Sequence, residues 1–340
     1  MLGKLLAGSV AAVALCACTT TVPLQGLPPA AVTALAETVP VGTANQDAAD
    51  DPAIWRNASD PAASLIVATD KKAGLYVYGL DGAVRNFTVS GLVNNVDLVD
   101  LPGAGVIVVA SDRNDLTQAA LQVYRLDPAS AALVPLASGP GGAGEGYGLC
   151  LGTFGGILRA YSVLKDGRVI EVQIGLAETP TFTTQRQLSV PSQAEGCVID
   201  QRDGTLYVAE EAGGIWRFDA GASSGELVAR VDNRYLVADV EGLALAPQGT
   251  SGGWLIASSQ GDDAYAVFAL PAMTPMGRFG VVEGRFGATQ GTDGIDLVLG
   301  DFGPLYPAGL LVAQDGHNQP AAQNFKLVSW ADVVAALGLD

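Results

Sequence analysis

Short apolar segments recur along the chain at a nearly constant spacing. Each copy begins with an acidic residue, and successive acidic residues are 46 to 52 positions apart: Asp51, Asp97, Glu145, Glu195, Glu241 and Asp293. Units of this length that each hold several short strands are typical of a β-propeller. The pattern therefore predicts an all-β fold with six blades, in which each acidic residue opens the innermost strand of its blade.

Two further apolar segments follow within each unit. The first set covers residues 65–70, 106–112, 158–163, 205–211, 254–260 and 310–316. The second set is rich in aromatic residues, as expected where neighbouring sheets pack face to face, and covers 74–82, 121–127, 167–174, 214–219, 264–270 and 325–330. The last unit ends there, apart from a helix-like tail at 331–337. We therefore expect the chain before Asp47 to supply the missing outer strand and to close the ring.

Composition agrees with this fold and limits the partners. The chain has 340 residues, of which 49% are hydrophobic, 16% are charged and 43 are glycine, as in β proteins with many tight turns. Its 35 acidic and 18 basic residues give a net charge of −17, and no basic stripe offers a nucleic-acid surface. An anionic substrate would also be repelled unless bound metal reverses the local charge.

The N-terminus reads as an export signal. Lys4 precedes an apolar run over 5–17 that is too short to span a bilayer comfortably, and the run ends Leu-Cys-Ala-Cys18. This ending resembles the bacterial lipoprotein signal, with Cys18 as the lipidated first residue. An ordinary cleaved signal peptide is the alternative.

These signals predict three regions and a location. Residues 1–18 form the signal up to the lipidated cysteine, 19–36 a Pro-, Ala- and Thr-rich tether, and 37–340 the propeller. We expect an exported monomer, attached to the cell envelope (outer membrane or periplasmic face) only through a lipid at Cys18, or otherwise periplasmic or secreted. In such a compartment Cys150 and Cys197 could form a disulfide or remain buried thiols.

The acidic positions predict a cation site. Carboxylates that open six innermost strands would converge near the central channel, and such a ring is strongly unfavourable without cations. Asp50 and Asp51 add charge at the first of these positions. A solvated acidic loop is the alternative for this stretch. Because all the ligands are oxygen, we expect several Ca²⁺ ions in and around the channel, in either a catalytic or a purely structural role.

Basic residues are few and fall at equivalent places. Lys71 and Lys72, Arg113, and Lys165 follow the second strand of units one, two and three. We expect them on one rim beside the carboxylates, where cations next to Ca²⁺ would form a phosphate receptor. Edge protection of the strands is the alternative explanation.

The single histidine restricts the mechanism. His317 lies in QDGHN, outside any histidine-phosphatase signature, and neither a Cys-based phosphatase loop nor a Ser-His-Asp set is apparent. The mechanism that remains is attack on phosphorus by a metal-activated water, with cations neutralising the equatorial oxygens.

Motifs in every predicted blade resemble those of a known protein family. They are DAADDPAIW (47–55), DKKAGLYVY (70–78), NNVD (94–97), EGYG (145–148), AEGCVID (194–200), LYVAEEAGGIW (206–216), DVEGL (239–243), TDGID (292–296), GLLVAQDGHN (309–318) and NFKLV (324–328). Together they span about residues 37–335, and the domain resembles the β-propeller phytases, also called alkaline phytases.

The resemblance implies a six-bladed propeller that needs Ca²⁺ to hydrolyse phosphate monoesters of phytate (myo-inositol hexakisphosphate), as a 3-phytase, releasing phosphate and lower inositol phosphates. By motif, the catalytic calcium cluster would be held by Asp50, Asp51, Glu195, Glu211, Asp239 and Glu241, with Asp296 as a further candidate. Structural calcium sites would use Asn95, Val96 (through its carbonyl), Asp293, Gln314, Asp315 and Glu37.

The same resemblance assigns phosphate contacts. They would come from Lys71, Lys72, Arg113, Tyr147, Lys165 and Asp166, the last in place of a Glu in the family. With Glu195, the residues Tyr147, Lys71, Arg113 and Lys165 would carry catalysis. Core packing is the alternative role for Tyr147. Cys150 and Cys197 would lie behind Tyr147 and Glu195 in consecutive inner strands, which suits a disulfide between two blades.

Three points stay open at this stage. A calcium-dependent propeller lactonase or phosphotriesterase would not need the four cations on one rim. A non-catalytic surface propeller would use calcium only for stability. Glu210 and Glu211 are adjacent in a strand and face opposite sides, so only one reaches the channel, and we expect Glu211.

Overall fold

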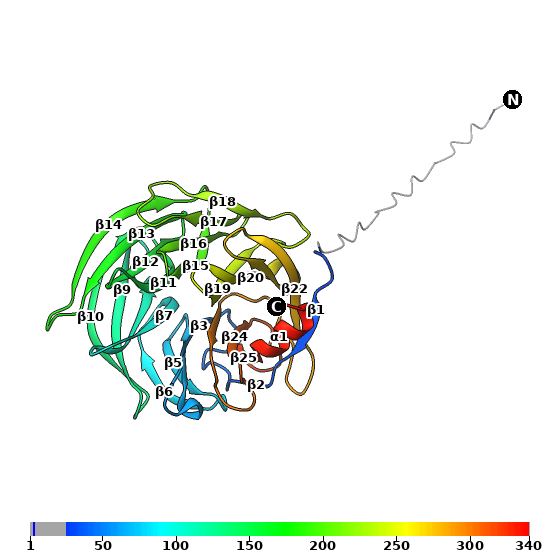
Figure 1. The fold of residues 1–340 in the computed structure, drawn as a ribbon, viewed down its shortest axis with the longest axis horizontal. Helices are drawn as coiled ribbons and strands as arrows, with labels where there is room; N and C mark the ends of the chain where they lie inside the picture. The colour runs from blue at the N-terminus through cyan, green and yellow to red at the C-terminus, as the bar shows by residue number, and fades with distance from the viewer. Residues whose placement is uncertain (1–2, 4–24, 340) are drawn as a thin grey trace.

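The computed structural model describes Gly3 and residues 25–339 (Figure 1). Apart from Gly3, the predicted signal segment lies outside these residues, and so do Cys18 and the first part of the tether. Six sheets surround a central axis, and each innermost strand packs against the innermost strands of the two neighbouring blades. The predicted six-bladed β-propeller is therefore confirmed.

Each blade follows the order of the repeat. The innermost strands are β3 (Ala49–Trp55), β7 (Val93–Leu101), β11 (Gly146–Phe154), β15 (Ala194–Asp200), β19 (Val240–Gln248) and β23 (Ile295–Leu299). The second strands are β4 (Leu65–Asp70), β8 (Gly105–Asp112), β12 (Ile157–Leu164), β16 (Thr205–Glu210), β20 (Gly252–Ser259) and β24 (Gly309–Asp315).

The third strands are β5 (Gly74–Gly79), β9 (Gln118–Asp127), β13 (Arg168–Gly175), β17 (Gly214–Phe218), β21 (Ala264–Ala269) and β25 (Asn324–Ser329). The outermost strands are β6 (Val84–Val89), β10 (Ala132–Ala143), β14 (Thr181–Ser189), β18 (Glu226–Arg230), β22 (Thr274–Val282) and, in the last blade, β2 (Ala36–Glu37). These four strands of each blade pair antiparallel.

The N-terminal segment closes the ring, as predicted. In β2, Ala36 and Glu37 pair with Leu327 and Lys326 of β25. One expectation needs correction: from Ala30 onward the predicted tether is part of the propeller. Strand β1 (Ala30–Thr33) adds a fifth, parallel strand to the edge of β22 and buries Val32. The alternation of exposed and buried residues over these four positions is too short to stand out in a Pro- and Ala-rich sequence.

The core lies between the blades. Buried apolar side chains from neighbouring sheets interdigitate, for example Val67 and Val77 of the first blade with Val108 and Tyr124 of the second. Helix α1 (Trp330–Leu337) packs on β1 and β22, and two short 3-10 helices, η1 (Pro61–Ala63) and η2 (Gln260–Asp262), lie in connections. Among the described residues, no helix combines the length and the apolar character that crossing a membrane requires.

A break in register recurs in the innermost strands. In five of them the register shifts by one residue, because two residues of the innermost strand stand opposite one residue of the second strand. These pairs are Asp50–Asp51, Asn94–Asn95, Tyr147–Gly148, Glu195–Gly196 and Glu241–Gly242. Asp293–Gly294 directly precede β23 in the sixth blade. A Cβ atom on Gly148 would lie 1.8 Å from the carbonyl oxygen of Glu195, so the next backbone passes too close for a side chain.

A disulfide joins two adjacent blades. Cys150 of β11 and Cys197 of β15 are bonded, with their Cα atoms 5.5 Å apart. Both cysteines are buried; Cys150 lies two residues beyond Gly148 and Cys197 one residue beyond Gly196, the second positions of the register breaks. The bond therefore ties the third and fourth innermost strands together just behind the residues that face the channel mouth.

Candidate functional site

The register breaks, and not the acidic residues themselves, define the ring at the channel mouth. Their first positions are Asp50, Asn94, Tyr147, Glu195, Glu241 and Asp293. The predicted ring is thus wrong in three blades: Asp50 takes the place of Asp51, and Asn94 and Tyr147 stand where carboxylates were expected. Asp97 lies three residues beyond Asn94, deeper in the channel, and Glu145 precedes Tyr147. The sequence spacing alone does not show the bulge, because the recurring acidic residues lie close to the bulge positions without always occupying them.

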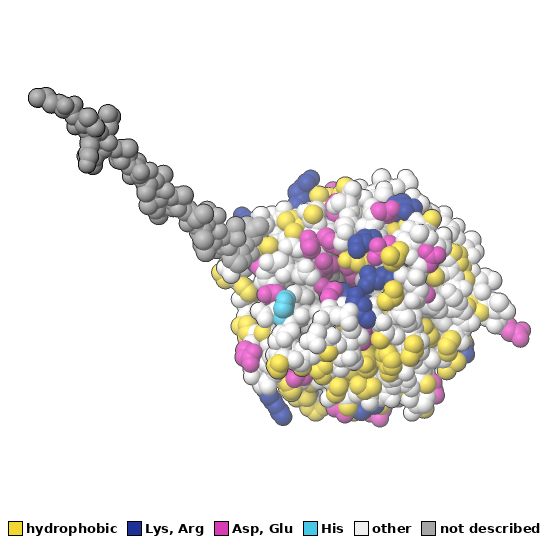
Figure 2. Space-filling model, turned by 180° about the vertical axis from the view of Figure 1, so that it is seen from behind, with side chains coloured by type: hydrophobic (Ala, Val, Ile, Leu, Met, Phe, Trp, Pro, Cys, Tyr) yellow, Lys and Arg dark blue, Asp and Glu magenta, His cyan; other side chains and the backbone are white. Residues whose placement is uncertain are grey.

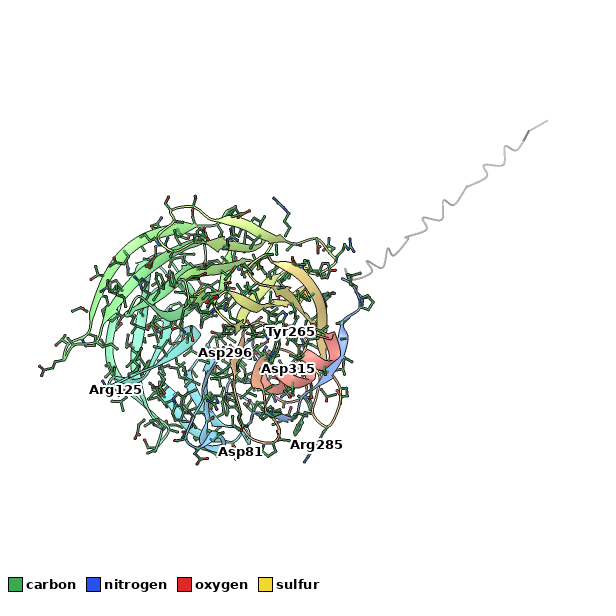
Figure 3. All side chains as sticks on the ribbon, viewed as in Figure 1. Asp81, Arg125, Tyr265, Arg285, Asp296 and Asp315 are labelled. Carbon is green, nitrogen blue, oxygen red and sulfur yellow. A yellow bond between two sulfur atoms is a disulfide. The ribbon has the colours of Figure 1, made fainter. Side chains whose placement is uncertain are left out.

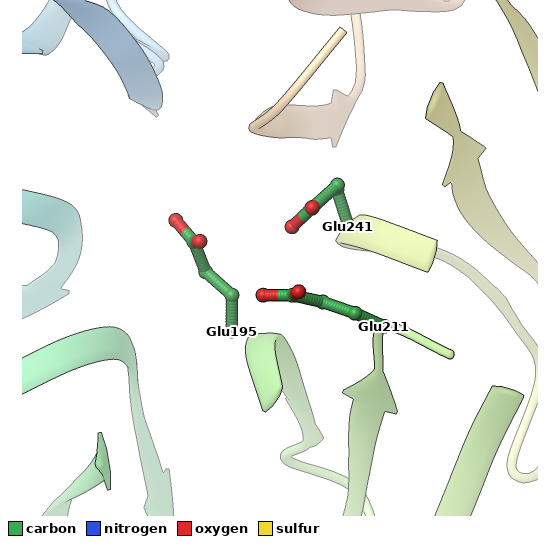
Figure 4. Close-up of side chains that lie close together, drawn as sticks. All are labelled: Glu195, Glu211 and Glu241. Atoms are coloured by element: carbon green, nitrogen blue, oxygen red, sulfur yellow. The ribbon is translucent and has the colours of Figure 1, made fainter. Parts of the chain in front are cut away.

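Three buried glutamates converge at this mouth. Glu195, Glu211 and Glu241 each offer a carboxylate oxygen within 4.8 Å of the other two, and they come from three separate segments (Figure 4). Burial raises the pKa of all three, and neighbouring carboxylates raise it further. The charge of Asp239 contributes to the raised pKa of both Glu211 and Glu241, which places it beside them. The structure therefore gathers acidic oxygens at a cost that a cation would remove.

Glu210 faces away from this group. Its carboxylate accepts hydrogen bonds from Trp216 Nε1 (2.8 Å) and Ser192 Oγ (2.5 Å). Gln193 Nε2, by contrast, donates to Glu211 Oε1 at 2.8 Å. Of the two adjacent glutamates, the structure brings Glu211 to the channel.

Lys71 is a buried cation within the acidic ring. Its Nζ lies 2.8 Å from Asp47 Oδ2, 2.9 Å from Asp50 Oδ1 and 3.4 Å from Asp293 Oδ2. Burial alone would lower the pKa of Lys71, but Asp50, Asp293 and Asp47 raise it above its usual value. Lys71 therefore stays charged and compensates one side of the ring. The structure places Asp293 here, although the resemblance implied a separate structural site.

Asn94 is a central residue that sequence reasoning missed. Its side chain is fully buried, and Nδ2 lies 2.9 Å from Asp50 Oδ2 and 2.7 Å from Glu195 Oε1. Its Oδ1 atom and Glu241 Oε2 are buried without a hydrogen-bond partner within the described residues. Two unpaired acceptors beside three glutamates fit a bound cation. Only the position of Asn94 at a bulge would have revealed it.

The remaining predicted cations form a second part of the site. Arg113 Nη1 and Lys165 Nζ lie 3.7 and 3.8 Å from Glu145 Oε1, so this glutamate holds both. Lys165 Nζ also lies 5.0 Å from the ring centre of Tyr147. The four predicted rim cations are not equivalent, because Lys71 is buried in the ring and Lys72 is exposed.

Tyr147 and Asp166 differ in their relation to the site. Burial raises the pKa of Tyr147, and so do the charges of Glu195 and Glu211, so the phenol stays protonated and can donate a hydrogen bond. Asp166 instead pairs with Arg168, at 2.7 Å between Oδ2 and Nη2. The described contacts of Asp166 are thus with Arg168 and not with Arg113 or Lys165.

A second acidic layer lies deeper in the channel. Asp51 Oδ2 accepts a hydrogen bond from Val96 N (3.1 Å), Asp97 Oδ2 one from Leu151 N (2.7 Å), and Asp296 Oδ2 one from Ile54 N (2.8 Å). These aspartates, with Asn95 and Val96, line a cavity of about 40 Å³.

Burial, reinforced by the charge of Asp296, raises the pKa of Asp97 to about 8, and burial raises that of Asp296 to about 6. Burial followed by Asp50 also raises the pKa of Asp51. Figure 3 shows Asp296 near the centre of the ring, whereas Asp315 belongs to β24 in the last blade. Asp296 therefore belongs to this inner layer and not to the glutamate cluster.

The predicted outer calcium ligands have other partners. Gln314 Oε1 accepts a hydrogen bond from Asp293 N at 2.8 Å, and its Nε2 donates to Ala49 O at 3.0 Å. Glu37 and Asp315 both pair with the ammonium group of Lys326. The exposed His317 lines an open cleft of about 740 Å³, which shares Asp293 with the ring and also contains Asp47, a partner of Lys71.

Acidic and basic groups meet on one face of the molecule. Figure 2 shows acidic side chains gathered near the middle of this face, with Lys and Arg side chains next to them. The fold and the site together define a six-bladed β-propeller with a buried carboxylate cluster at one channel mouth and the cationic groups of Arg113 and Lys165 beside it. Such a site can bind metal cations and, through them, an anionic group.

Comparisons with known proteins identify the family. A solved structure titled "Crystal Structure of Mitotic Checkpoint Complex" contains a chain with a TM-score of 0.53 at 14% identity, covering 96% of this chain and 87% of its own, which shows the fold alone. The model of the family described as Phytase matches residues 3–340. A 3-phytase of Bacillus subtilis (strain 168) is 37% identical over 332 residues, covering 90% of this chain and 85% of the relative. The chain belongs to the Phytase family, as its motifs predicted.

Proposed function

We propose that the chain is a calcium-dependent phytase, which hydrolyses phosphate monoesters of phytate and releases phosphate. The observation that carries the proposal is the cluster of Glu195, Glu211 and Glu241, buried beside unpaired acceptor atoms. Arg113 and Lys165 lie alongside it. Family membership supports the reaction, and the chemistry of the oxygen donors supports calcium as the metal.

The donor set fits a hard cation. Carboxylate and amide oxygens are ligands that Ca²⁺ prefers, and the unpaired Oδ1 of Asn94 and Oε2 of Glu241 are acceptors that need a positive partner. We assign the ligands to a set around the channel mouth: Asp50, Asn94, Glu195, Glu211, Asp239 and Glu241. When bound, calcium supplies charge that neutralises phosphoryl oxygens and lowers the pKa of a nearby water.

The chain's own side chains have distinct tasks. Arg113 and Lys165 bind phosphoryl oxygens from one side, and Glu145 holds the two cations in position. Tyr147 donates a hydrogen bond from a phenol that stays protonated, because burial and its acidic neighbours raise its pKa. Lys71 keeps Asp50 oriented and adds fixed positive charge. This arrangement favours charge that develops on a transferred phosphoryl group.

A direct assay tests the proposal. Phosphate release from phytate should rise with added Ca²⁺, stop after exhaustive chelation and return when Ca²⁺ is restored. Activity that survives chelation would reject the metal-dependent mechanism. A folded protein that releases no phosphate at any calcium concentration would favour a binding propeller, and hydrolysis of lactones or phosphotriesters alone would favour the other enzyme class.

We also propose, from the sequence, that the protein is exported as a monomer and anchored through a lipid on Cys18. Replacement of Cys18 by alanine should move the protein from the membrane fraction to the soluble fraction. An unchanged distribution would argue for an ordinary cleaved signal peptide or another mode of attachment.

A further inference from the structure

Lys326 lies at the centre of a cage of oxygen atoms. Its side chain is fully buried in β25, and four oxygens surround its Nζ. They are Glu37 Oε2 at 2.5 Å, Asn324 Oδ1 at 3.0 Å, Asp315 Oδ2 at 3.1 Å and Asn318 Oδ1 at 3.3 Å. An ammonium has three donors, so this cage pairs it completely.

The cage has the composition of a calcium site. Two carboxylates and two amide oxygens are the kinds of ligand that Ca²⁺ takes, at about 2.3–2.6 Å from the ion. Because these oxygens already contact the ammonium, an ion at such distances would overlap Lys326 Nζ. If an ion displaced Lys326 from these oxygens, the ammonium group would remain buried without its partners, which is strongly unfavourable.

Neighbouring groups restrict movement of the Lys326 side chain out of the cage. Asn324 Nδ2 donates to Glu37 Oε2 at 3.2 Å and to Thr38 O at 3.1 Å, which fixes the wall of the cage. On another side lies Gly287, where a Cβ atom would already be 3.4 Å from Lys326 Nζ. Gly287 itself offers no side-chain ligand to a metal at this point.

The cage also lies at the closure of the ring. Glu37 belongs to β2, near the N-terminal end of the described chain, whereas Lys326 and Asp315 belong to β25 and β24 near its C-terminal end. Glu37 and Lys326 are direct partners in the β2–β25 register. The ion pair therefore joins the two ends of the chain within one blade.

We infer that the ammonium of Lys326 is the permanent cation of this closure site and that no calcium ion binds there. The expectation that Glu37 and Asp315 are calcium ligands is replaced by this assignment. It follows that calcium acts at the channel and that closure of the ring does not depend on it. This inference stands independently of the proposed catalytic activity.

Calcium stoichiometry tests the inference. Equilibrium dialysis of the full chain against Ca²⁺ should give the same number of bound ions for the wild type and for Glu37→Gln, whose side chain is partly exposed and keeps an acceptor oxygen. Glu195→Gln serves as the matched control and should lose calcium affinity at the channel. If Glu37→Gln binds one ion fewer than the wild type, the inference is overturned.

A second variant tests the role of the lysine. Lys326→Met should lower the melting temperature in chelator by several degrees, and Ca²⁺ should raise it by more than in the wild type, because two carboxylates then lack their cation. A melting temperature equal to that of the wild type in chelator would show that Lys326 does not hold the closure. If Lys326→Met does not fold, the Glu37→Gln stoichiometry decides the question.

Discussion

Single residues at the channel mouth are held in states that the protein interior disfavours. Burial raises the pKa of Glu195 and Glu241, and adjacent carboxylates raise it further. A structural core would replace such groups with apolar side chains. Their retention beside the cationic Arg113 and Lys165 is expected where the carboxylates serve binding or catalysis.

Glu195 and Tyr147 are the most informative single replacements. Glu195→Gln removes a charged ligand and Tyr147→Phe removes a donor, so each should lower kcat on phytate by roughly 100-fold or more. The melting temperature in chelator should stay near that of the wild type. Glu226→Gln, at an exposed position of β18 in the blade of Glu195, is the control and should keep full activity. Full activity of both site variants would mean that the site is misplaced.

Asn94 tests the part of the site that sequence reasoning did not find. Asn94→Ala removes the donor shared by Asp50 and Glu195 together with an unpaired acceptor. We expect a loss of about 10–100-fold in activity, of the size seen when groups that orient metal ligands are removed. The calcium concentration for half-maximal activity should rise in parallel. An unchanged calcium requirement would contradict the assignment of Asn94 as a ligand.

At the scale of elements, the innermost strands place the site through their bulges. Each bulge turns one residue toward the channel and leaves the next against the neighbouring backbone. That second residue is glycine in four blades: Gly148, Gly196, Gly242 and Gly294. The pairs Glu195-Gly196, Glu241-Gly242 and Asp293-Gly294 thus each place an acidic side chain at the channel mouth, followed by a close backbone contact.

Gly196→Ala tests this packing. A Cβ atom there would lie 2.1 Å from the carbonyl oxygen of Glu241, so the two innermost strands must move apart. Unfolding in denaturant should show a loss of about 1–3 kcal/mol, with reduced activity. Gly280→Ala in β22 is a matched control, since its nearest contact would be 3.5 Å away. Equal stability of the two variants would contradict the role of the bulge.

The elements also show how far sequence reasoning reaches. The six repeats, the three inner strands of each blade and the closing strand follow from the apolar pattern, because each blade repeats the same burial. The register at the channel mouth cannot be predicted from this pattern, because a bulge position can hold Asn94 or Tyr147 as readily as an acidic residue. Asp97 and Glu145 fit the acidic repeat of the sequence, but both lie outside the bulge positions.

Partners that are distant in sequence were equally hidden. Lys326 reads as an ordinary strand residue until β2 brings Glu37 against it. A near neighbour was also missed: Asp166 follows Lys165 directly, yet its carboxylate pairs with Arg168 two residues further on. Motifs indicate which residues are present, whereas the direction of each side chain depends on contacts that form only in the folded ring.

At the scale of the whole molecule, the buried carboxylates of the channel repel one another to an extent that depends on pH. Burial and the charge of Asp296 raise the pKa of Asp97 to about 8. Between about pH 4 and pH 8 the folded state then binds more protons at Asp97 than the unfolded chain does. The free energy of unfolding of the calcium-free protein should therefore fall as the pH rises through this range.

Asp97→Asn tests this prediction. In chelator, denaturant unfolding at about pH 5 and pH 8 should show a smaller loss of stability in the variant, by about 1 kcal/mol or more. The difference between the two pH values is the readout, because the amide also changes the hydrogen bonds to Leu98 and Leu151. An equal loss in both proteins would contradict the raised pKa.

The central claim is that the carboxylates at the channel mouth hold calcium for the reaction. The most direct measurement is a crystal structure of the calcium-loaded protein, with ions located by their anomalous scattering. We expect at least one ion about 2.3–2.6 Å from carboxylate oxygens of Glu195, Glu211 and Glu241. A protein that needs calcium for activity but shows no ion at these three glutamates would contradict the account.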